Sequence, residues 1–381
     1  MTNTLAPTRR ARGTVLAAAP LTIMAAAIIA PSLPAMRAGF ADTPGSGLLV
    51  RLALTVTSLA IAISAPLSGI VADRVGRRPL LLSGLVLYAV SGTAGFFVDD
   101  LYLLLITRAA LGLAVGGIMT AVSTLLTDWF TGGRRASFLG LQQAFASLGG
   151  VVFLPLAGLL ATVNWHAPFW IYSVSAIVAV FALVSLREPE RNSPAAGSVI
   201  GIYVLALLVT LVFYMAPTQL PFLLEGFGSG PAVVGAVVAG STLTGVVGAL
   251  AFPRLRRRLG PTAITTVSVA LMGVGWLVIG TAGTVAQVVA GLLAGGLGVG
   301  FVVPNLNLRL AEAADPARRG RVLSGLVTGI FLGQFLSPLV VQPLVQGIGI
   351  AGAFTWSGIA LAAGAALAAL LSNRNNGKET R

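Results

Sequence analysis

The chain has 381 residues, of which 56% are hydrophobic and only 9% are charged, and its mean hydropathy is +0.94. A soluble globular domain does not have this composition, whereas a protein with many membrane spans does. The chain has no cysteine, which excludes a disulfide framework, thiol catalysis and a cysteine-based metal site. The net charge of +13 is compatible with nucleic-acid binding, but the placement of the arginines indicates membrane topology instead.

Apolar runs divide the chain into twelve segments, each close to the ~20 residues that a helix needs to cross a bilayer. The first follows a basic start but is too long for a signal peptide, so we interpret it as an uncleaved span. The sequence therefore predicts an all-α membrane protein. The spans are expected at residues 14–35, 49–72, 80–97, 102–126, 136–161, 166–186, 199–223, 231–252, 262–281, 284–309, 321–346 and 350–372.

Basic residues concentrate in every second link between these spans. The odd-numbered links hold Asp42, Asp99, Asp100 and Glu225, with Arg37 as their basic residue. Arginines concentrate in the cytoplasmic loops of membrane proteins, so both termini are expected in the cytoplasm. The even-numbered links carry Arg74, Arg77, Arg78, Arg134, Arg135, Arg187, Arg191, Arg254, Arg256, Arg257, Arg258, Arg318, Arg319 and Arg321.

The longest polar break inside the chain separates two halves. It covers residues 187–198 and is predicted to be a cytoplasmic linker between an N-terminal six-helix bundle, residues 1–186, and a C-terminal one, residues 199–381. The halves repeat weakly, because Gly140 is separated from Gly325 by the same number of residues as Phe169 is from Phe354. This favours two pseudo-symmetric bundles built from parallel repeats.

The short loop after the second span, residues 68–79, combines one carboxylate with three arginines. Arg74, Arg77 and Arg78 suit the negative end of a helix dipole, and Gly76 can end that helix. Asp73 is unfavourable at a helix C-terminus, so we expect it to have a partner, either an arginine or the N-terminus of another helix. Gly69, one turn earlier, allows another helix to approach closely.

This loop resembles the signature Gly-x-x-x-Asp-Arg-x-Gly-Arg-Arg of the major facilitator superfamily. Gly69, Asp73, Arg74, Gly76, Arg77 and Arg78 match it position by position. The resemblance implies the major facilitator fold, with two six-helix bundles. It also implies that the aspartate is a conformational latch onto the other half. The alternative, an ordinary basic loop of another membrane protein, leaves the aspartate unexplained.

Two further stretches resemble signatures of this superfamily. Residues 105–117 resemble its fourth-helix pattern, with a membrane-embedded arginine, Arg108, and a glycine ladder that includes Gly112 and Gly116. Residues 150–158 resemble the span-five pattern of the exporters, although Leu154 replaces a glycine. Gly150, Pro155 and Gly158 are the matching residues, with expected roles in helix packing and gating. Together these stretches resemble the drug:proton antiporter, or multidrug efflux, group.

Ionisable residues inside spans are functional candidates. Arg108 is expected either to line the central cavity, where it contacts substrate or steers protons, or to bind backbone carbonyls of a neighbouring helix. The middle of each predicted span lacks a carboxylate, which leaves Asp73, Asp128 and Glu225 as weak candidates for proton coupling. The resemblance also places polar residues around the cavity, and each is expected either to face substrate or to form a hydrogen bond between helices. They are Gln142, Gln143, Tyr214, Gln219, Asn305, Asn307 and Gln334.

These observations predict a secondary active transporter that works by alternating access, with proton-coupled efflux of hydrophobic or amphipathic small molecules as the first hypothesis. A facilitator or importer of a small metabolite or organic anion is the alternative within transport, and a non-transporting receptor or scaffold is the alternative outside it. The sequence has no phosphate-binding loop for ATP, no metal-ligand cluster and no nucleophile–base pair of an enzyme. The expected partners are a small-molecule substrate, protons and the lipid bilayer. A monomer without cofactor in a bacterial inner membrane is expected.

Overall fold

The computed structural model describes residues 7–29, 32–44, 46–188, 200–229, 231–314 and 319–379, and the regular structure in them is entirely helical. The predicted all-α fold is therefore confirmed. The first half contains α1 (Arg9–Ala18), α2 (Pro20–Ala27), α3 (Leu33–Gly39), α4 (Ser46–Arg74), α5 (Arg77–Ala94), η2 (Gly95–Phe97), α6 (Leu101–Trp129), α7 (Gly132–Val163), η3 (Ala167–Ser173) and α8 (Val174–Ser185). The second half contains α9 (Ile200–Phe213), α10 (Met215–Gly226), α11 (Pro231–Arg258), α12 (Pro261–Gly280), α13 (Val285–Ala313) and α14 (Arg319–Glu379).

Within the described residues, nine helical segments are long and apolar enough to cross a membrane. One of them, in α14, contains two predicted spans, because the chain turns at Gly349 with a φ of 75° inside this element. The first predicted span is broken between α1 and α2. In a regular helix the carbonyl oxygen of Leu16 would accept the N–H of residue 20, but Pro20 has none. The N–H of Ala19 donates to this oxygen in its place. Among the described residues, each predicted span falls mainly on helical residues.

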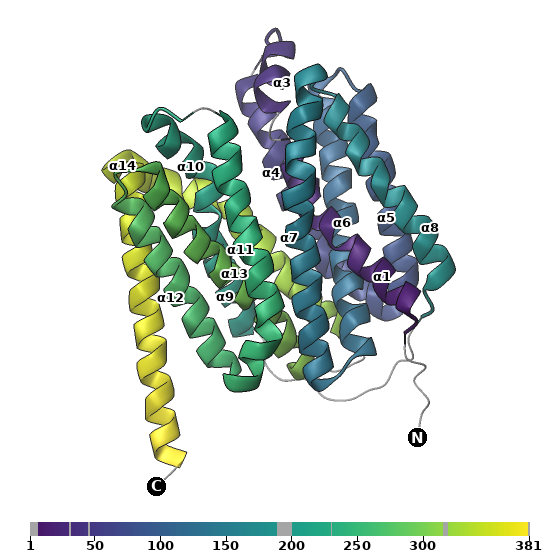
Figure 1. Ribbon diagram of the computed structural model, residues 1–381. Helices are drawn as coiled ribbons and strands as arrows, with labels where there is room; N and C mark the ends of the chain where they lie inside the picture. Colours follow the sequence, from purple (N-terminus) through teal and green to yellow (C-terminus); the bar gives the residue numbers. More distant parts are fainter. Residues whose placement is uncertain are drawn as a thin grey trace.

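The helices form two bundles that stand side by side, α1–α8 and α9–α14 (Figure 1). The bundles meet where α4 packs on α14 and where α7 packs on α11. The division into domains at the linker remains a prediction, because residues 189–198 lie outside the described part of the chain. The start of α1 and the end of α14 lie at the same end of the molecule (Figure 1).

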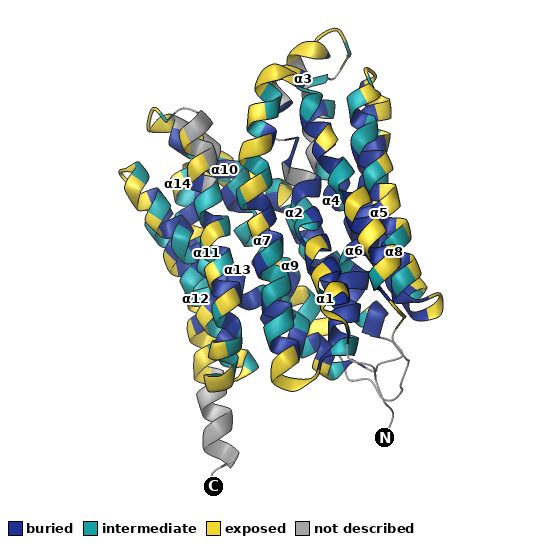
Figure 2. Ribbon diagram, turned by 45° about the vertical axis from the view of Figure 1, so that its right-hand side comes forward, coloured by how far each residue is buried: buried dark blue, intermediate teal, exposed yellow. Residues whose placement is uncertain are grey.

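Small residues let the helices of each bundle approach closely. A side chain at Gly112 of α6 would lie 2.5 Å from the carbonyl oxygen of Thr57 and 2.6 Å from Cβ of Ala60, both in α4. Buried positions gather inside the bundles, whereas much of their outer surface is exposed (Figure 2). That surface includes large apolar side chains such as Val184, which is 78% exposed. An apolar exterior of this kind is suited to a lipid environment.

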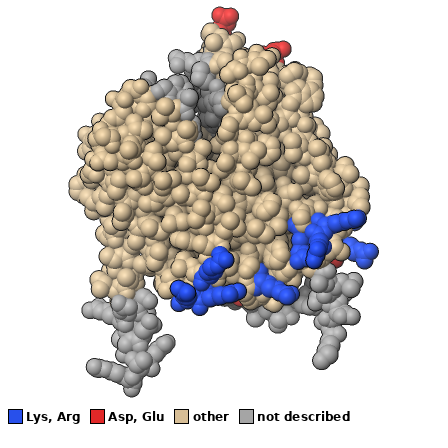
Figure 3. All heavy atoms as spheres, in the orientation of Figure 1, with Lys and Arg blue, Asp and Glu red and all other residues tan. Residues whose placement is uncertain are grey.

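Charges divide between the two ends of the molecule. On the face drawn in Figure 3, Arg side chains gather at the end where α1 begins, with a few acidic atoms between them, and acidic atoms also mark the opposite tip. We call the first the basic end. It is formed by the C-termini of α4, α8 and α11 and the N-termini of α1, α5, α7 and α14. The side chains of Arg37 and Glu225 lie outside the described part of the structure. That the basic end faces the cytoplasm remains a prediction.

Candidate gate and central cavity

Asp73, in the last turn of α4, caps the N-terminus of α14. Its Oδ1 accepts a hydrogen bond from the backbone N–H of Gly320 at 3.0 Å, and its Oδ2 accepts one from that of Arg321 at 3.1 Å. Only 8% of the residue is exposed. A helix N-terminus carries free N–H groups and a partial positive charge, so it stabilises a carboxylate that its own helix disfavours. The contact joins the first half of the protein to the second.

Two glycines make this contact possible. A side chain at Gly69 would lie 2.8 Å from both Cα of Arg321 and the carbonyl oxygen of Gly320. A side chain at Gly320 would lie 2.9 Å from the carbonyl oxygen of Gly69. The backbones of α4 and α14 therefore touch directly at the basic end.

Arg77 connects this contact to α6. Its guanidinium donates from Nε to Asp128 Oδ2 at 3.1 Å and from Nη1 to the Ala72 carbonyl oxygen at 3.1 Å. Its Nη2 is 3.9 Å from Asp73 Oδ1. Asp128 in turn accepts a short hydrogen bond from Arg319 of α14. Asp73, Arg77, Asp128 and Arg319 thus alternate in charge, and we call them the ionic chain.

A second link between the halves lies at the start of α7. The buried Arg135 donates from Nε to the Phe130 carbonyl oxygen at 2.7 Å and from Nη1 to the Ala311 carbonyl oxygen of α13 at 3.4 Å. The second half has an ion pair of its own that is more exposed to solvent. It joins Arg256 Nη2 to Glu312 Oε2 at 3.8 Å. The basic end is therefore closed by contacts from α4, α6 and α7 to α13 and α14.

Glu188, which the sequence reasoning missed, binds the loop between α4 and α5. Its two carboxylate oxygens accept hydrogen bonds from the backbone N–H groups of Arg77 and Arg78 at 2.6 and 2.8 Å, so it caps the N-terminus of α5. Gly76 has a φ of 127°, and a side chain there would lie 2.8 Å from Glu188 Oε1. Arg74 is exposed at the end of α4. The sequence signal was an acidic residue directly after the sixth span, close to a loop with three arginines.

A small cavity lies between the two halves, away from the ionic chain. Its volume is about 40 Å³, which holds water but is far below the roughly 300–1,000 Å³ of a pocket for a drug-sized ligand. Its walls come from α2, α6 and α7 of the first half and α13 and α14 of the second. The polar residues that line it are Thr22, Ser123, Gln142, Gln143 and Asn307.

The amides in this cavity keep unused hydrogen-bonding capacity. Gln142 donates to Ser123 Oγ at 3.1 Å, but its Oε1 is buried and accepts no hydrogen bond from the described residues. Within the described residues, Asn307 donates to the Val303 carbonyl oxygen of its own helix at 3.2 Å and has no hydrogen bond to another helix. Buried polar groups are normally satisfied, so an amide left open at a cavity is suited to contact a ligand.

Arg108 does not line this cavity, so the expectation of a cavity cation is wrong for this conformation. The residue is fully buried inside the first bundle, where Nη2 donates to the Ser91 and Gly92 carbonyl oxygens of α5, each at 3.0 Å. Its guanidinium carbon lies 4.8 Å from the ring centre of Phe169 and 5.1 Å from that of Tyr172. This is the backbone-binding alternative, stabilised by cation–π contacts.

The remaining predicted site residues lie apart from the cavity. Asn305 donates to the Pro261 carbonyl oxygen and to Thr265, and so joins α13 to α12. Tyr214 separates α9 from α10, Gln219 is buried in α10, and Gln334 is half-buried in α14.

The glycines and the proline of the predicted packing motifs differ in their surroundings. Gly116 faces Ser64 of α4 closely, and a side chain at Gly150 would lie 3.4 Å from Ile23 and 3.6 Å from Thr242 of the second half. The helix α7 continues through Pro155, and a side chain at Gly158 would meet nothing within 4 Å.

Two helical bundles with apolar outer surfaces, a cavity between them and closure at one end are typical of a membrane transporter. The sequence profile of the Major Facilitator Superfamily matches residues 15–201 and 202–381. The chain therefore belongs to this superfamily, and the protein is a transporter rather than an enzyme.

Curated relatives are drug-resistance proteins at low identity. The chain is 27% identical to the class C tetracycline resistance protein of Escherichia coli, with 89% of this chain and 90% of that protein covered. It is also 27% identical to multidrug resistance protein 1 of Bacillus subtilis, over 53% of this chain and 56% of that protein. The quinolone resistance protein NorA of Staphylococcus aureus is 25% identical over 37% of each chain.

Solved structures show the same fold. The human organic anion transporter MFSD10 superposes with a TM-score of 0.82 at 19% identity, covering 94% of this chain and 99% of that one. The proton:xylose symporter XylE, bound to a bromo-deoxyglucose, superposes with a TM-score of 0.78 at 15% identity, covering 94% of each.

Proposed function

We propose that this protein exports hydrophobic or amphipathic small molecules in exchange for protons, by alternating access of the cavity between its two halves. The observation that carries the proposal is this cavity, which is lined by amides of Gln142 and Asn307 from opposite halves and is closed at the basic end. The drug-resistance names of the relatives support export of this class of compound.

The closed basic end defines what must change during transport. With that end in the cytoplasm, as the arginine distribution favours, this conformation is closed to the cytoplasm. Opening it breaks the hydrogen bonds that Asp73 accepts from α14, the Asp128–Arg319 pair and the hydrogen bond from Arg135 to Ala311. The site residues of the signature loop act in this proposal as a latch whose strength sets the balance between two conformations.

The lining of the cavity favours neutral or weakly charged substrates. Apolar side chains such as Met119, Leu326 and Ile330 supply most of the wall, and none of its lining residues is charged. A wall of this kind with a few amides binds amphipathic compounds. Because the cavity is small in this conformation, it must widen to take a drug-sized molecule.

Proton coupling acts, in this proposal, on the gate. The carboxylates that lie between the halves are Asp73 and Asp128 of the ionic chain, whereas the cavity itself is lined by none. A proton on either carboxylate removes a charge that holds the halves together, so protonation and opening are linked.

A second candidate function is facilitated movement or import of a small neutral metabolite or organic anion. The fold neighbours that favour it are an organic anion transporter and a sugar symporter. Arg108 provides no anion contact in the cavity, which weakens the anion version.

Inverted vesicles with the purified protein and an acidic lumen test the proposal. A tetracycline, a quinolone, ethidium, xylose and a small organic anion are added one at a time while a lumenal dye reports pH. Alkalinisation caused by the lipophilic compounds and lost in Gln142→Ala and Asn307→Ala supports proton-coupled export through this cavity. The control is Gln342→Ala, which removes an amide that is exposed on α14. Labelled compound that crosses without any pH response rejects the antiporter and leaves a facilitator.

A further inference from the structure

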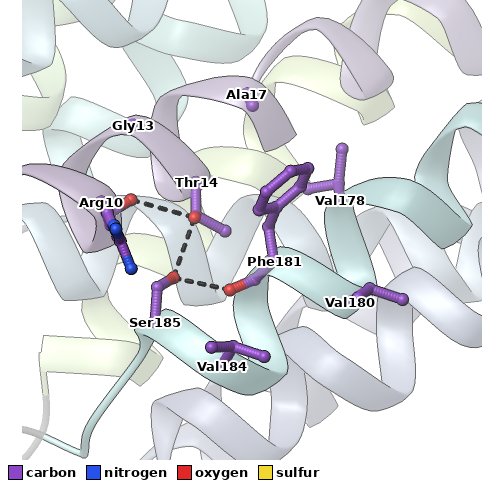
Figure 4. A pocket seen from close by; sticks show the side chains of 9 residues that line it. All are labelled: Arg10, Gly13, Thr14, Ala17, Val178, Val180, Phe181, Val184 and Ser185. Atoms are coloured by element: carbon purple, nitrogen blue, oxygen red, sulfur yellow. Dashed lines mark hydrogen bonds between the residues drawn. The ribbon is translucent and has the colours of Figure 1, made fainter.

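A large groove lies on the outside of the first bundle, and none of its lining residues belongs to the ionic chain or to the central cavity. Its volume is about 570 Å³, and α1 and α8 form its walls. Figure 4 shows its polar side chains, Arg10, Thr14 and Ser185, at one end and Val178, Val180 and Phe181 toward the other. The groove is therefore amphipathic along its length.

The apolar part of this groove opens toward the bilayer. Val180 is 63% exposed, Phe181 61% and Val184 78%. Ser185 and Val178 are seven residues apart in α8, which corresponds to about 10 Å of helix at ~1.5 Å per residue. An extended acyl chain that starts beside Ser185 can lie along this surface.

The polar end offers two hydroxyl groups for hydrogen bonding. Thr14 Oγ1 and Ser185 Oγ lie 2.9 Å apart, while Thr14 also donates to the Arg10 carbonyl oxygen at 3.0 Å and Ser185 to that of Phe181 at 2.6 Å. The two hydroxyls have only two hydrogens for these three contacts. One hydroxyl can therefore donate to a ligand oxygen while it still accepts from the other, and it then gives up only the hydrogen bond to its own helix.

The charge at this end is positive. Arg10 is exposed and forms no ion pair within the described residues, and Arg187 is exposed nearby at the same basic end. The neighbouring carboxylate, Glu188, is already bound by the backbone of α5. Basic pockets between membrane helices attract anionic lipid head groups, by about 1 kcal/mol for each basic residue.

We propose that this groove binds one anionic phospholipid. Its phosphate lies between Arg10 and the hydroxyls of Thr14 and Ser185, and one acyl chain follows Phe181 and Val178. The combination of a guanidinium with no ion-pair partner among the described residues, a hydroxyl pair and an exposed apolar channel matches the two chemical parts of such a lipid.

Two variants separate the head-group contact from the chain contact. Arg10→Gln removes the charge, with Arg9→Gln as its control, because Arg9 is on the same helix but does not line the groove. Gly13→Leu fills the groove, and a side chain there meets nothing within 4 Å, so the fold should persist. Its control is Gly201→Leu, the same change at an exposed glycine of α9 with equally open surroundings.

Native mass spectrometry with phosphatidylglycerol or phosphatidylcholine measures binding to each variant. We expect wild type to bind one phosphatidylglycerol about five-fold more tightly than phosphatidylcholine. Arg10→Gln should lose that ratio, Gly13→Leu should lose the tight site for both lipids, and the two controls should match wild type. Equal losses in Arg9→Gln and Arg10→Gln, or unchanged binding in Gly13→Leu, would overturn the proposal. Displacement of the lipid by inorganic phosphate or by ethidium would also overturn it, because the groove would then be an ion site or a drug site.

Discussion

Buried charges in this protein are stabilised by backbone groups as much as by opposite charges. Asp73 is held by two N–H groups of α14, and Arg108 by two carbonyl oxygens of α5. In a bilayer, where water cannot compensate, backbone dipoles of this kind keep an isolated charge tolerable. The two residues differ in their partners, because Arg108 binds within one bundle and Asp73 binds across the two.

Substitution of Arg108 by Ala should therefore destabilise the protein rather than weaken substrate binding. The loss of its carbonyl and aromatic contacts should cost about 2–5 kcal/mol of unfolding free energy, as for other large-to-small changes in a packed interior. Lysine should restore little, since its ammonium lacks the planar group that stacks on the rings of Phe169 and Tyr172. Thermal unfolding and substrate affinity, measured in detergent, check this. A lower affinity with unchanged stability would return Arg108 to the transport path.

Asp73→Asn should keep the fold and weaken the latch. An amide has one acceptor oxygen, so its NH₂ group meets one of the two N–H groups of α14, and the charge at the helix N-terminus is lost. We expect the closed state to lose about 1–2 kcal/mol, or about ten-fold in population, with a corresponding fall in turnover. Vesicle transport measures the effect, and Asp99→Asn, an exposed site at the opposite end, is the control. Wild-type turnover in Asp73→Asn would remove the latch from the mechanism.

At the scale of elements, the gate depends on helix ends that meet without side chains between them. The α4–α14 contact has a glycine on each side, and α5 begins with a cap supplied by Glu188 of the segment after α8. Glycine is needed where backbones touch, because a single methyl group displaces a whole helix.

Gly69→Ala should consequently prevent closure of the basic end. The new methyl group would lie 2.8 Å from backbone atoms of α14, and backbone cannot move aside as a flexible side chain can. Gly158→Ala is the matched control, because a side chain there meets nothing within 4 Å. Transport should fall at least ten-fold in the first variant and stay near wild type in the second. If both transport equally well, the backbone contact is not required for turnover.

At the scale of the whole molecule, the two bundles behave as bodies whose relative position is set by a few contacts. The ionic chain joins them through the Asp128–Arg319 pair, which is nearly buried on both sides. Breaking one partner of such a pair leaves a buried charge uncompensated, so its effect on the balance between open and closed forms is large.

A double-mutant cycle of Asp128→Asn and Arg319→Gln should give a coupling free energy of about 1–3 kcal/mol for closure. The chain has no cysteine, so nitroxides on Arg134→Cys and Arg257→Cys, both exposed at the basic end of opposite halves, report the opening directly. The control cycle uses Asp99→Asn and His166→Gln, a pair within the first half at the opposite end. That control should leave the distance between halves unchanged. A similar shift in both cycles would show that total charge, not the link between bundles, controls closure.

Local patterns of the sequence were sufficient for the all-α fold, the placement of the spans and the superfamily. Span length and hydropathy are properties of single segments, and arginine-rich links reflect the membrane boundary. The same patterns did not reveal the break at Ala19 or the cap from Glu188, because each depends on where one residue meets another segment.

Only the tertiary structure decided which partners the charged residues have. From the sequence, Asp73 had two possible partners and Arg108 two possible environments. Packing places Asp73 on the N-terminus of α14, with Arg77 close by, and turns Arg108 into its own bundle toward α5. Hydrophobic patterns determine that a residue is embedded in the membrane. The direction in which its side chain points depends on how helices far apart in the chain pack together, which is a property of the assembled bundles and not of any one segment.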